Sequence, residues 1–238
     1  DINESQLAFT VEPERGVRFG LTAIKNVGEG AVESLLKVRA KQGRIRSIHS
    51  LCEDLDLRLV NKRVFESLVK AGAFDSLASG TEYETLSTRD LRPRLIGMIV
   101  AACEHGARLQ DDRERGQGGL FGDLEQASPV ANGLGGLILP AGTAWTETEQ
   151  LGFEKETLGL YWSGHPVDRY ATALQAFGAR STGELAEAPV APAREDAWGP
   201  GGRRPTEPDT SLGGIITACR PLKTRKGDRM AVFTVEDA

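Results

Sequence analysis

The chain has 238 residues, of which 39% are hydrophobic and 26% charged, and its formal net charge is −5. This composition supplies enough apolar side chains for one large core or two small ones, as in a soluble intracellular protein. No apolar run approaches the roughly 20 residues of a membrane helix and no signal peptide opens the chain, so we expect a cytoplasmic protein that does not contact a membrane.

The charges are unevenly distributed. Residues 14–72 hold 12 Lys and Arg against 7 Asp and Glu, whereas the rest of the chain is acidic. A basic region within an acidic chain favours local contact with phosphates over a general DNA coat. Cysteines and histidines lack the paired spacing of a zinc site, so we expect no metal and interpret the cysteines as buried free thiols in a reducing cytosol: Cys52, Cys103, Cys219, His49, His105 and His165.

The first half of the chain predicts a succession of helices after a polar start with one short strand near Phe9 and Val11. Apolar residues recur at helical spacing. Asn61 is a favoured N-cap, and Gly43 and Gly72 stand where helices end. The expected helices cover residues 31–41, 47–55, 61–71 and 91–109, the last with Pro93 in its first turn.

The second half is more broken. Glycine and proline interrupt residues 116–142, which we interpret as an extended stretch, and Ala, Pro and Gly dominate a linker over 186–210. Two apolar runs flank Gly227-Asp228 and predict a β-hairpin, which alone would be marginal in water. Further helices are expected over 146–160 and 167–177, with a turn at 163–166 between them.

Val27-Gly28-Glu29-Gly30-Ala31 joins two helical segments in a helix-hairpin-helix pattern. Glycine adopts positive φ at low cost and lets the backbone approach a phosphate closely. The following helix N-terminus offers unpaired N–H donors and a partial positive charge. Such a turn contacts the DNA backbone without reading bases. The predicted DNA-binding residues here are Lys25, Val27, Gly28, Glu29 and Gly30, and the other reading is a plain helical turn.

Two further places add basic residues. Residues 59–75 resemble a second helix-hairpin-helix copy, in which Lys62 and Arg63 are predicted DNA contacts. This copy lacks the Gly-x-Gly, so a purely structural role stays open. The final hairpin crowds four basic residues around one turn, for which contact with single-stranded DNA and a merely solvated turn are both open: Lys223, Arg225, Lys226 and Arg229.

Four segments resemble bacterial DNA polymerase III alpha subunits and occur in the family's order: Asp1–Ser5, Arg18–Gly28, Asn61–Asp75 and Glu156–Pro166. The resemblance implies a mainly α fold, with a paired helix-hairpin-helix domain followed by a truncated β (OB-fold) hairpin. It divides the chain into the end of the fingers region (1–16), the helix-hairpin-helix domain (17–185), a linker (186–210) and the first OB-fold strands (211–238).

The resemblance also implies a function. The chain would be a DNA-binding and sliding-clamp-binding segment of a replicative DNA polymerase, with duplex DNA, single-stranded template, the sliding clamp and other holoenzyme subunits as partners. Gln117-Gly118-Gly119-Leu120-Phe121 lies in the loop near 116–142, where the family carries its internal clamp-binding motif. Leu120 and Phe121 would enter an apolar pocket and Gln117 would satisfy its rim.

No catalytic residue is predicted. Glu53, Asp54 and Asp56 imitate a metal-binding spacing, but we interpret them as a solvated helix end. His165 beside Pro166 is interpreted as a turn histidine held by backbone contacts. In the family the catalytic aspartates lie upstream, so magnesium is expected in the parent polymerase and no cofactor in this segment.

Two alternatives remain at this point. One is a free-standing helix-hairpin-helix protein that binds DNA or assists its repair, and the other is an error-prone polymerase of the alpha type. The chain opens on Asp1 rather than Met and closes on an incomplete β domain. We therefore expect it to be part of a longer polymerase, in which it grips DNA without performing the chemistry.

Overall fold

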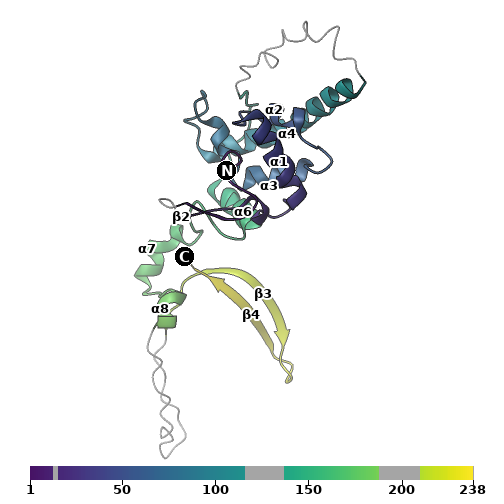
Figure 1. Cartoon of the computed structure of the whole chain (residues 1–238). Helices are drawn as coiled ribbons and strands as arrows, with labels where there is room; N and C mark the ends of the chain where they lie inside the picture. Colours follow the sequence, from purple (N-terminus) through teal and green to yellow (C-terminus); the bar gives the residue numbers. More distant parts are fainter. Residues whose placement is uncertain (13–15, 116–136, 188–209, 238) are drawn as a thin grey trace, which may run out of the picture. The chain divides into compact units, whose positions relative to one another are not determined.

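The computed structural model describes residues 1–12, 16–115, 137–187 and 210–237, which form two compact units, Asp1–Trp162 and Ser163–Ala238 (Figure 1). The chain is mainly helical with small antiparallel hairpins, which confirms the predicted fold class, whereas the OB-fold and the expected domain limits stay predictions. None of the helices seen in the described ranges has the length and apolarity to cross a membrane.

The first unit contains most of the helices. Its elements are β1 Thr10–Glu12, β2 Gly16–Arg18, η1 Leu21–Ala23, α1 Glu29–Gln42, α2 Ile48–Asp54, α3 Lys62–Lys70, η2 Asp75–Ala78, α4 Thr88–Glu114 and α6 Glu147–Leu158. The helices predicted over 31–41, 47–55, 61–71, 91–109 and 146–160 are present, with ends that differ by up to five residues, whereas the helix predicted over 167–177 is divided between a 3-10 turn and a shorter α-helix. The second unit contains η3 Asp168–Tyr170, α7 Ala171–Ala176, α8 Thr182–Glu187, β3 Ile215–Lys223 and β4 Arg229–Glu236.

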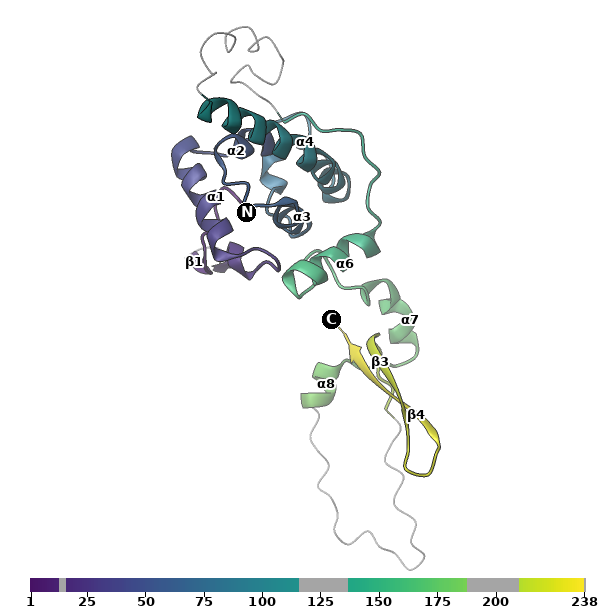
Figure 2. The same cartoon turned by 90° about the vertical axis from the view of Figure 1, so that its right-hand side faces the viewer.

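The core of the first unit lies between α1, α2, α3 and α4, and Figures 1 and 2 show α4 running past α2 and α3. Leu35, Phe65 and Leu95 are completely buried there. The Phe65 and Phe74 rings stack with centroids 6.1 Å apart. Each such side chain contributes about 1.5–3 kcal/mol when removed from water, so this cluster fixes the helices that carry the candidate site.

Local sequence signals set several helix ends. The Asn61 side chain accepts hydrogen bonds from the N–H groups of Arg63 and Val64 at the start of α3, as predicted for an N-cap. Gly43 follows α1 with φ of 76°, and Gly72 follows α3 with φ of 80°. Both glycines therefore end their helices with positive φ, as expected.

The start of α4 differs from the prediction. Ser87 caps the helix, so α4 begins at Thr88 and Pro93 lies inside it rather than in its first turn. Proline has no N–H, which leaves the Arg89 carbonyl without its intrahelical donor. The N–H of Trp145 donates to that carbonyl at 2.9 Å. A distant segment thus satisfies the carbonyl, which explains how the proline is tolerated.

The other end of α4 holds the C-terminus of α2. Gln110 Nε2 donates to the carbonyls of Cys52 and Leu55, at 2.9 Å in both cases. Gly106 allows this close approach, because a Cβ there would lie 2.3 Å from the Cys52 carbonyl oxygen. The last carbonyls of α2 are therefore satisfied by side chains of α4.

The cysteines differ from expectation in part. Cys52 is buried and Cys103 half-buried, whereas Cys219 on β3 is exposed, so the prediction of buried thiols is wrong for Cys219. The Cys52 thiol hydrogen-bonds to Cys103, and this bond together with burial raises the pKa of Cys52. Cys219 is exposed because both faces of its hairpin are largely uncovered within the described residues.

Both β-hairpins are antiparallel. In the first unit Val11 lies opposite Val17, so the short strand predicted near Phe9 and Val11 is present as β1. In the second unit β3 and β4 pair from Ile215 opposite Glu236 to Lys223 opposite Arg229. Gly227 in the connecting turn has φ of 91°, which confirms the predicted glycine turn.

Candidate nucleic-acid interface

The segment between η1 and α1 forms a tight hairpin on a buried apolar base. Leu21, Ile24 and Val27 are buried, and the Val27 N–H donates to the Ile24 carbonyl at 3.1 Å. Gly28 then caps α1 in extended conformation, with φ of −79° and ψ of 158°. A short helix, a turn and a longer helix follow one another as the sequence predicts, although the first helix is a single 3-10 turn.

The positive φ in this hairpin belongs to Asn26, at 67°, and not to a glycine. Gly28 is extended and Gly30 lies within α1, so the prediction that these glycines are needed for positive φ is wrong. Asparagine is one of the few non-glycine residues that adopt the left-handed region readily. Its Nδ2 donates to Ser67 Oγ on α3 at 3.1 Å, which ties the turn to the helix core.

Gly28 and Gly30 are exposed, and a Cβ added at either position would meet nothing within 4 Å. Neither backbone conformation nor packing inside the described unit therefore requires glycine at these two positions. No side chain in the described residues caps α1, so the N–H groups of its first turn point outward at the positive end of the helix dipole. The surface is open to a close-approaching anion, although the Glu29 carboxylate carries the opposite charge.

The structure places the predicted contact residues in different surroundings. Lys25 is exposed beside the turn, and its backbone N–H donates to the Thr157 carbonyl of α6 at 2.9 Å. Val27 is only 6% exposed and its N–H already donates to Ile24, so the structure does not support the predicted DNA contact by Val27. Lys62 and Arg63 are exposed in the first turn of α3, and Arg63 shares a helix face with Ser67, four residues later.

The glycine of the second copy has an internal role. Gly72 has φ of 80°, and a Cβ there would lie 2.5 Å from Arg92 Nη2 and 2.9 Å from Asp75 Oδ2. Arg92 forms ion pairs with Asp75 at 2.7 Å and with Glu154 at 3.1 Å. Gly72 therefore makes room for a buried ion network, which favours the structural reading for this glycine.

That network was not recognised from the sequence. Glu154 is fully buried and also accepts hydrogen bonds from Gln150 Nε2 at 3.1 Å and from the Trp162 N–H at 2.9 Å. Burial raises the pKa of Asp75, while its hydrogen bonds to Arg92 act in the opposite direction. No local signal distinguished this arginine, because Arg89, Asp90 and Arg94 surround it in the first two turns of α4.

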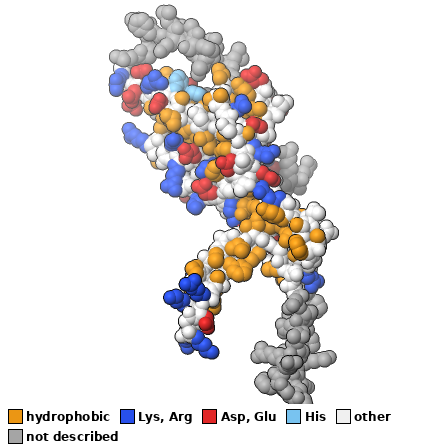
Figure 3. Space-filling model, turned by 180° about the vertical axis from the view of Figure 1, so that it is seen from behind, with side chains coloured by type: hydrophobic (Ala, Val, Ile, Leu, Met, Phe, Trp, Pro, Cys, Tyr) orange, Lys and Arg blue, Asp and Glu red, His pale blue; other side chains and the backbone are white. Residues whose placement is uncertain are grey.

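The basic residues of the last hairpin gather at its tip in the second unit. Lys223 pairs across the strands with Arg229, and both are exposed together with Arg225 and Lys226. Figure 3 shows these Lys and Arg side chains at the end of a hairpin arm that is otherwise largely apolar. Like charges directly opposite one another destabilise a hairpin, so this tip is suited to a polyanion that screens them.

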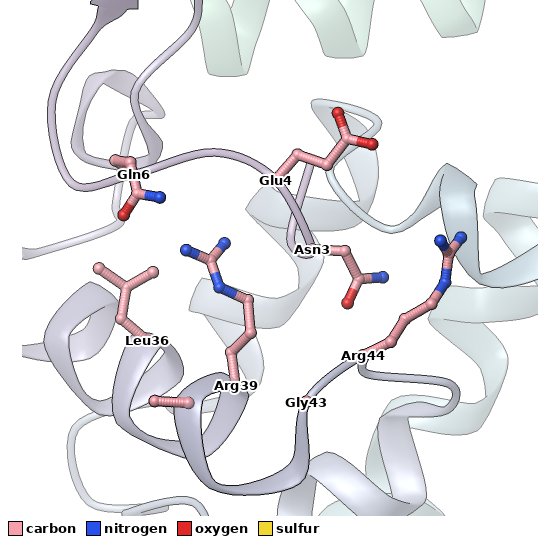
Figure 4. Close-up of a pocket in the computed structure, with 8 residues that line it drawn as sticks. Asn3, Glu4, Gln6, Leu36, Arg39, Gly43 and Arg44 are labelled. Carbon is pink, nitrogen blue, oxygen red and sulfur yellow. The ribbon is translucent and has the colours of Figure 1, made fainter.

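A hollow of about 550 Å³ lies beside the C-terminal part of α1 (Figure 4). Arg39 and Arg44 project into it around Asn3. Arg39 Nη1 donates to the carbonyls of Ile2 and Ser5, at 3.0 and 2.7 Å, and burial lowers its pKa. The guanidinium thus anchors the N-terminal segment.

The acidic residues at the C-terminal end of α2 are divided among different partners. Asp54 accepts hydrogen bonds from Lys41 Nζ at 2.8 Å and Gln42 Nε2 at 2.9 Å, which lower its pKa. Glu53 lies 3.7 Å from His105, and Asp56 accepts the Arg58 N–H. Within the residues that the structure describes, no group of three His, Cys, Asp or Glu could hold a metal ion.

His165 lies in a turn, as predicted. Its Nδ1 accepts the Val167 N–H at 3.3 Å, and its own N–H donates to Asp168 Oδ2 at 2.7 Å. The predicted clamp-binding residues Gln117, Leu120 and Phe121 lie outside the described residues.

The sequence of this chain is similar to a known motif family and to several known proteins. Residues 1–82 match the family model described as a helix-hairpin-helix motif. The whole chain is 31% identical to the DNA polymerase III subunit alpha of Pseudomonas aeruginosa and covers 19% of that protein. It is 32% identical to the DNA polymerase III subunit alpha of Vibrio cholerae and to that of Haemophilus influenzae, and covers 18% of each.

The chain thus spans about a fifth of the length of the curated relatives that it matches. The matched region contains the Asn26 turn and the exposed Gly28 and Gly30, and it extends past α3 and Gly72 to residue 82. Over its full length the chain is homologous to one segment of the bacterial DNA polymerase III alpha subunit, and it carries a helix-hairpin-helix motif.

Proposed function

We propose that this chain is a DNA-binding and sliding-clamp-binding segment of a bacterial replicative DNA polymerase and performs no catalysis itself. The observation that carries the proposal is the pair of exposed glycines at the start of α1, Gly28 and Gly30, which nothing inside the described unit requires. Glycine forms helices less readily than alanine, and neither packing nor backbone conformation requires it at Gly30, so this glycine needs another reason. Close approach of a ligand to the backbone is such a reason.

The ligand that fits this surface is a phosphate of duplex DNA. The first turn of α1 offers outward N–H groups and the positive end of the helix dipole. Lys25 is exposed beside this turn, and Lys62 and Arg63 are exposed on the neighbouring α3. Contacts from backbone and basic side chains hold the phosphate chain irrespective of base sequence. Binding should therefore be sequence-independent and should weaken as salt rises.

The test is a Gly30→Val variant of the full chain, compared with Gly152→Val. Gly152 is also an exposed helical glycine with nothing within 4 Å of an added Cβ, but it lies in α6. At neither position would an added Cβ meet another atom of the described unit within 4 Å, so both variants should fold. We expect Gly30→Val to weaken duplex binding about tenfold or more, through lost charge-assisted hydrogen bonds, and Gly152→Val to bind normally. We call residues 25–30, which form the hairpin and the start of α1, the α1 turn. Equal affinity of both variants for duplex DNA would show that the α1 turn does not bind DNA.

The second unit is proposed to begin an OB-fold that contacts single-stranded template. Its hairpin is apolar on both faces, because Phe233 lies opposite Cys219 on one face and Met230 opposite Leu222 on the other. A strand pair with two apolar faces is suited to burial within a larger sheet or barrel. Its exposed basic tip is suited to a nucleic-acid backbone.

The remaining parts of the proposal concern the parent protein. We propose that Gln117, Leu120 and Phe121 bind the sliding clamp, that other holoenzyme subunits assemble with the parent chain, and that it acts in the cytoplasm. DNA-directed DNA synthesis and its magnesium ions are assigned to other parts of the parent polymerase. The full-length match inside much longer polymerase subunits supports this over a free-standing repair protein.

A further inference from the structure

We infer that Asn26 is a positioning residue, which fixes the shape of the DNA-binding hairpin through its hydrogen bond to Ser67 on α3. The inference rests on the proposed function of the α1 turn and concerns how that turn is held. Asn26 contacts the core through Ser67, while the surface offered to DNA begins two residues later at Gly28.

The backbone of Asn26 shows that its side chain matters. Asn26 is the only non-glycine residue with positive φ among those that the structure describes. If conformation alone decided this position, glycine would adopt φ of 67° at lower cost. The amide side chain adds what glycine lacks, a donor that reaches Ser67 Oγ at 3.1 Å.

The partner of Asn26 strengthens the argument. Ser67 is only 4% exposed, so water cannot readily replace Asn26 as the partner of its hydroxyl. Loss of the bond would leave a buried polar group unsatisfied, which is more costly than loss of an exposed bond. The turn and α3 are therefore joined by a bond that resists local opening.

Consecutive residues hold the turn from three sides. The Lys25 N–H donates to the Thr157 carbonyl of α6, Asn26 bonds Ser67 of α3, and Val27 is buried in the core. Gly28 follows directly and starts α1. A surface whose shape is fixed before binding does not lose that freedom when the ligand binds, so preorganisation raises affinity.

The experiment compares Asn26→Gly, Ser67→Ala and the double variant in the full chain, with a duplex oligonucleotide of mixed sequence as the probe. Asn26→Gly keeps the positive φ accessible and removes the side chain that carries the amide. We expect each single variant to bind about threefold to tenfold more weakly, and the double variant to bind no more weakly than either, because all lose one shared bond. Amide hydrogen exchange at residues 28–31 should become faster in the same variants.

Ser76→Ala is the matched control. It removes another Asn–Ser hydrogen bond, from Asn3 Nδ2 to Ser76 Oγ at 3.3 Å, outside the hairpin. We expect it to leave duplex affinity and exchange at residues 28–31 unchanged, even where its effect on thermal stability equals that of Ser67→Ala. If Asn26 contributed only to the stability of the fold, Ser67→Ala and Ser76→Ala would have the same affinity for duplex DNA.

The outcomes separate this inference from the proposed function. If Gly30→Val loses duplex binding while Asn26→Gly and Ser67→Ala bind like the parent chain, the positioning role is wrong and the α1 turn remains the binding surface. A double variant whose loss equals the sum of the single losses would also overturn it, because the residues would then act independently. If Gly30→Val binds duplex normally as well, both proposals fail.

Discussion

Glycine residues of this chain look alike in the sequence, yet their surroundings differ. An added Cβ at Gly72 would collide with Arg92 and Asp75, whereas one at Gly30 would point into open space. Packing inside the unit requires glycine at position 72, whereas nothing inside the unit requires glycine at position 30. The buried Arg92 also joins Asp75 and Glu154, so the same few residues link η2, α4 and α6.

At the residue scale we predict that Gly72→Ala destabilises the chain more than Gly80→Ala. Both glycines have positive φ, at 80° and 74°, so alanine costs about 1–2 kcal/mol of backbone energy at each. Nothing lies within 4 Å of an added Cβ at Gly80, whereas Gly72→Ala also displaces the buried Arg92. In urea unfolding we expect Gly72→Ala to lose at least about 1 kcal/mol more. Equal losses would mean that the ion network adapts freely.

At the element scale the β3–β4 hairpin combines an apolar body with a basic tip. Its strands have complete cross-strand pairing near the turn, where Lys223 lies opposite Arg229. The pairing and the turn are formed in the structure, and both faces of the hairpin are largely exposed within the described residues.

We predict that the tip contacts single-stranded DNA. Replacing Lys223, Arg225, Lys226 and Arg229 by glutamine in the full chain should weaken single-strand binding and spare duplex binding. Each lost phosphate contact should lower the salt dependence of single-strand affinity by roughly 0.7 in a plot of log K against log salt. Affinity for duplex oligonucleotide serves as the internal control. An equal loss for both substrates would argue against a single-strand role, and no loss for either would make this a solvated turn.

At the scale of the whole molecule, distant segments converge on the α1 turn. The turn bonds α3 through Asn26 and α6 through Lys25, and α6 bonds α4 through Glu154 and Arg92. Residues 116–136, which precede α6 in the sequence, include the predicted clamp-binding motif. The proposed DNA binding and the proposed clamp binding can therefore be measured separately on variants of the same chain.

We predict that the Leu120→Ala, Phe121→Ala double variant loses binding to the bacterial sliding clamp and keeps its duplex affinity. Burial of the two apolar side chains would contribute roughly 1.5–3 kcal/mol each, offset in part by ordering of the peptide, so micromolar clamp affinity is expected. Surface plasmon resonance on immobilised clamp measures the first property and a DNA titration the second. Gly30→Val is the reciprocal control, since it should lose DNA and keep the clamp. Unchanged clamp binding by the double variant would show that Leu120 and Phe121 do not bind the clamp.

The sequence by itself determined the features that depend on neighbours along the chain. Apolar spacing located the helices, Asn61 and Gly43 located their ends, and Gly227-Asp228 located the hairpin turn, because each acts within a few residues. The order of motifs such as Arg18–Gly28 also identified the family, since homology preserves residue order.

Only the tertiary structure decided what depends on residues far apart in the sequence. It assigned positive φ to Asn26 rather than to Gly28 or Gly30, and it brought the Asn26 amide to Ser67, 41 positions away. It likewise showed how Pro93 is accommodated within α4, because Trp145 satisfies the carbonyl that the proline leaves without a donor. Such residues come into contact only in the folded chain, so no local sequence pattern predicts their contacts.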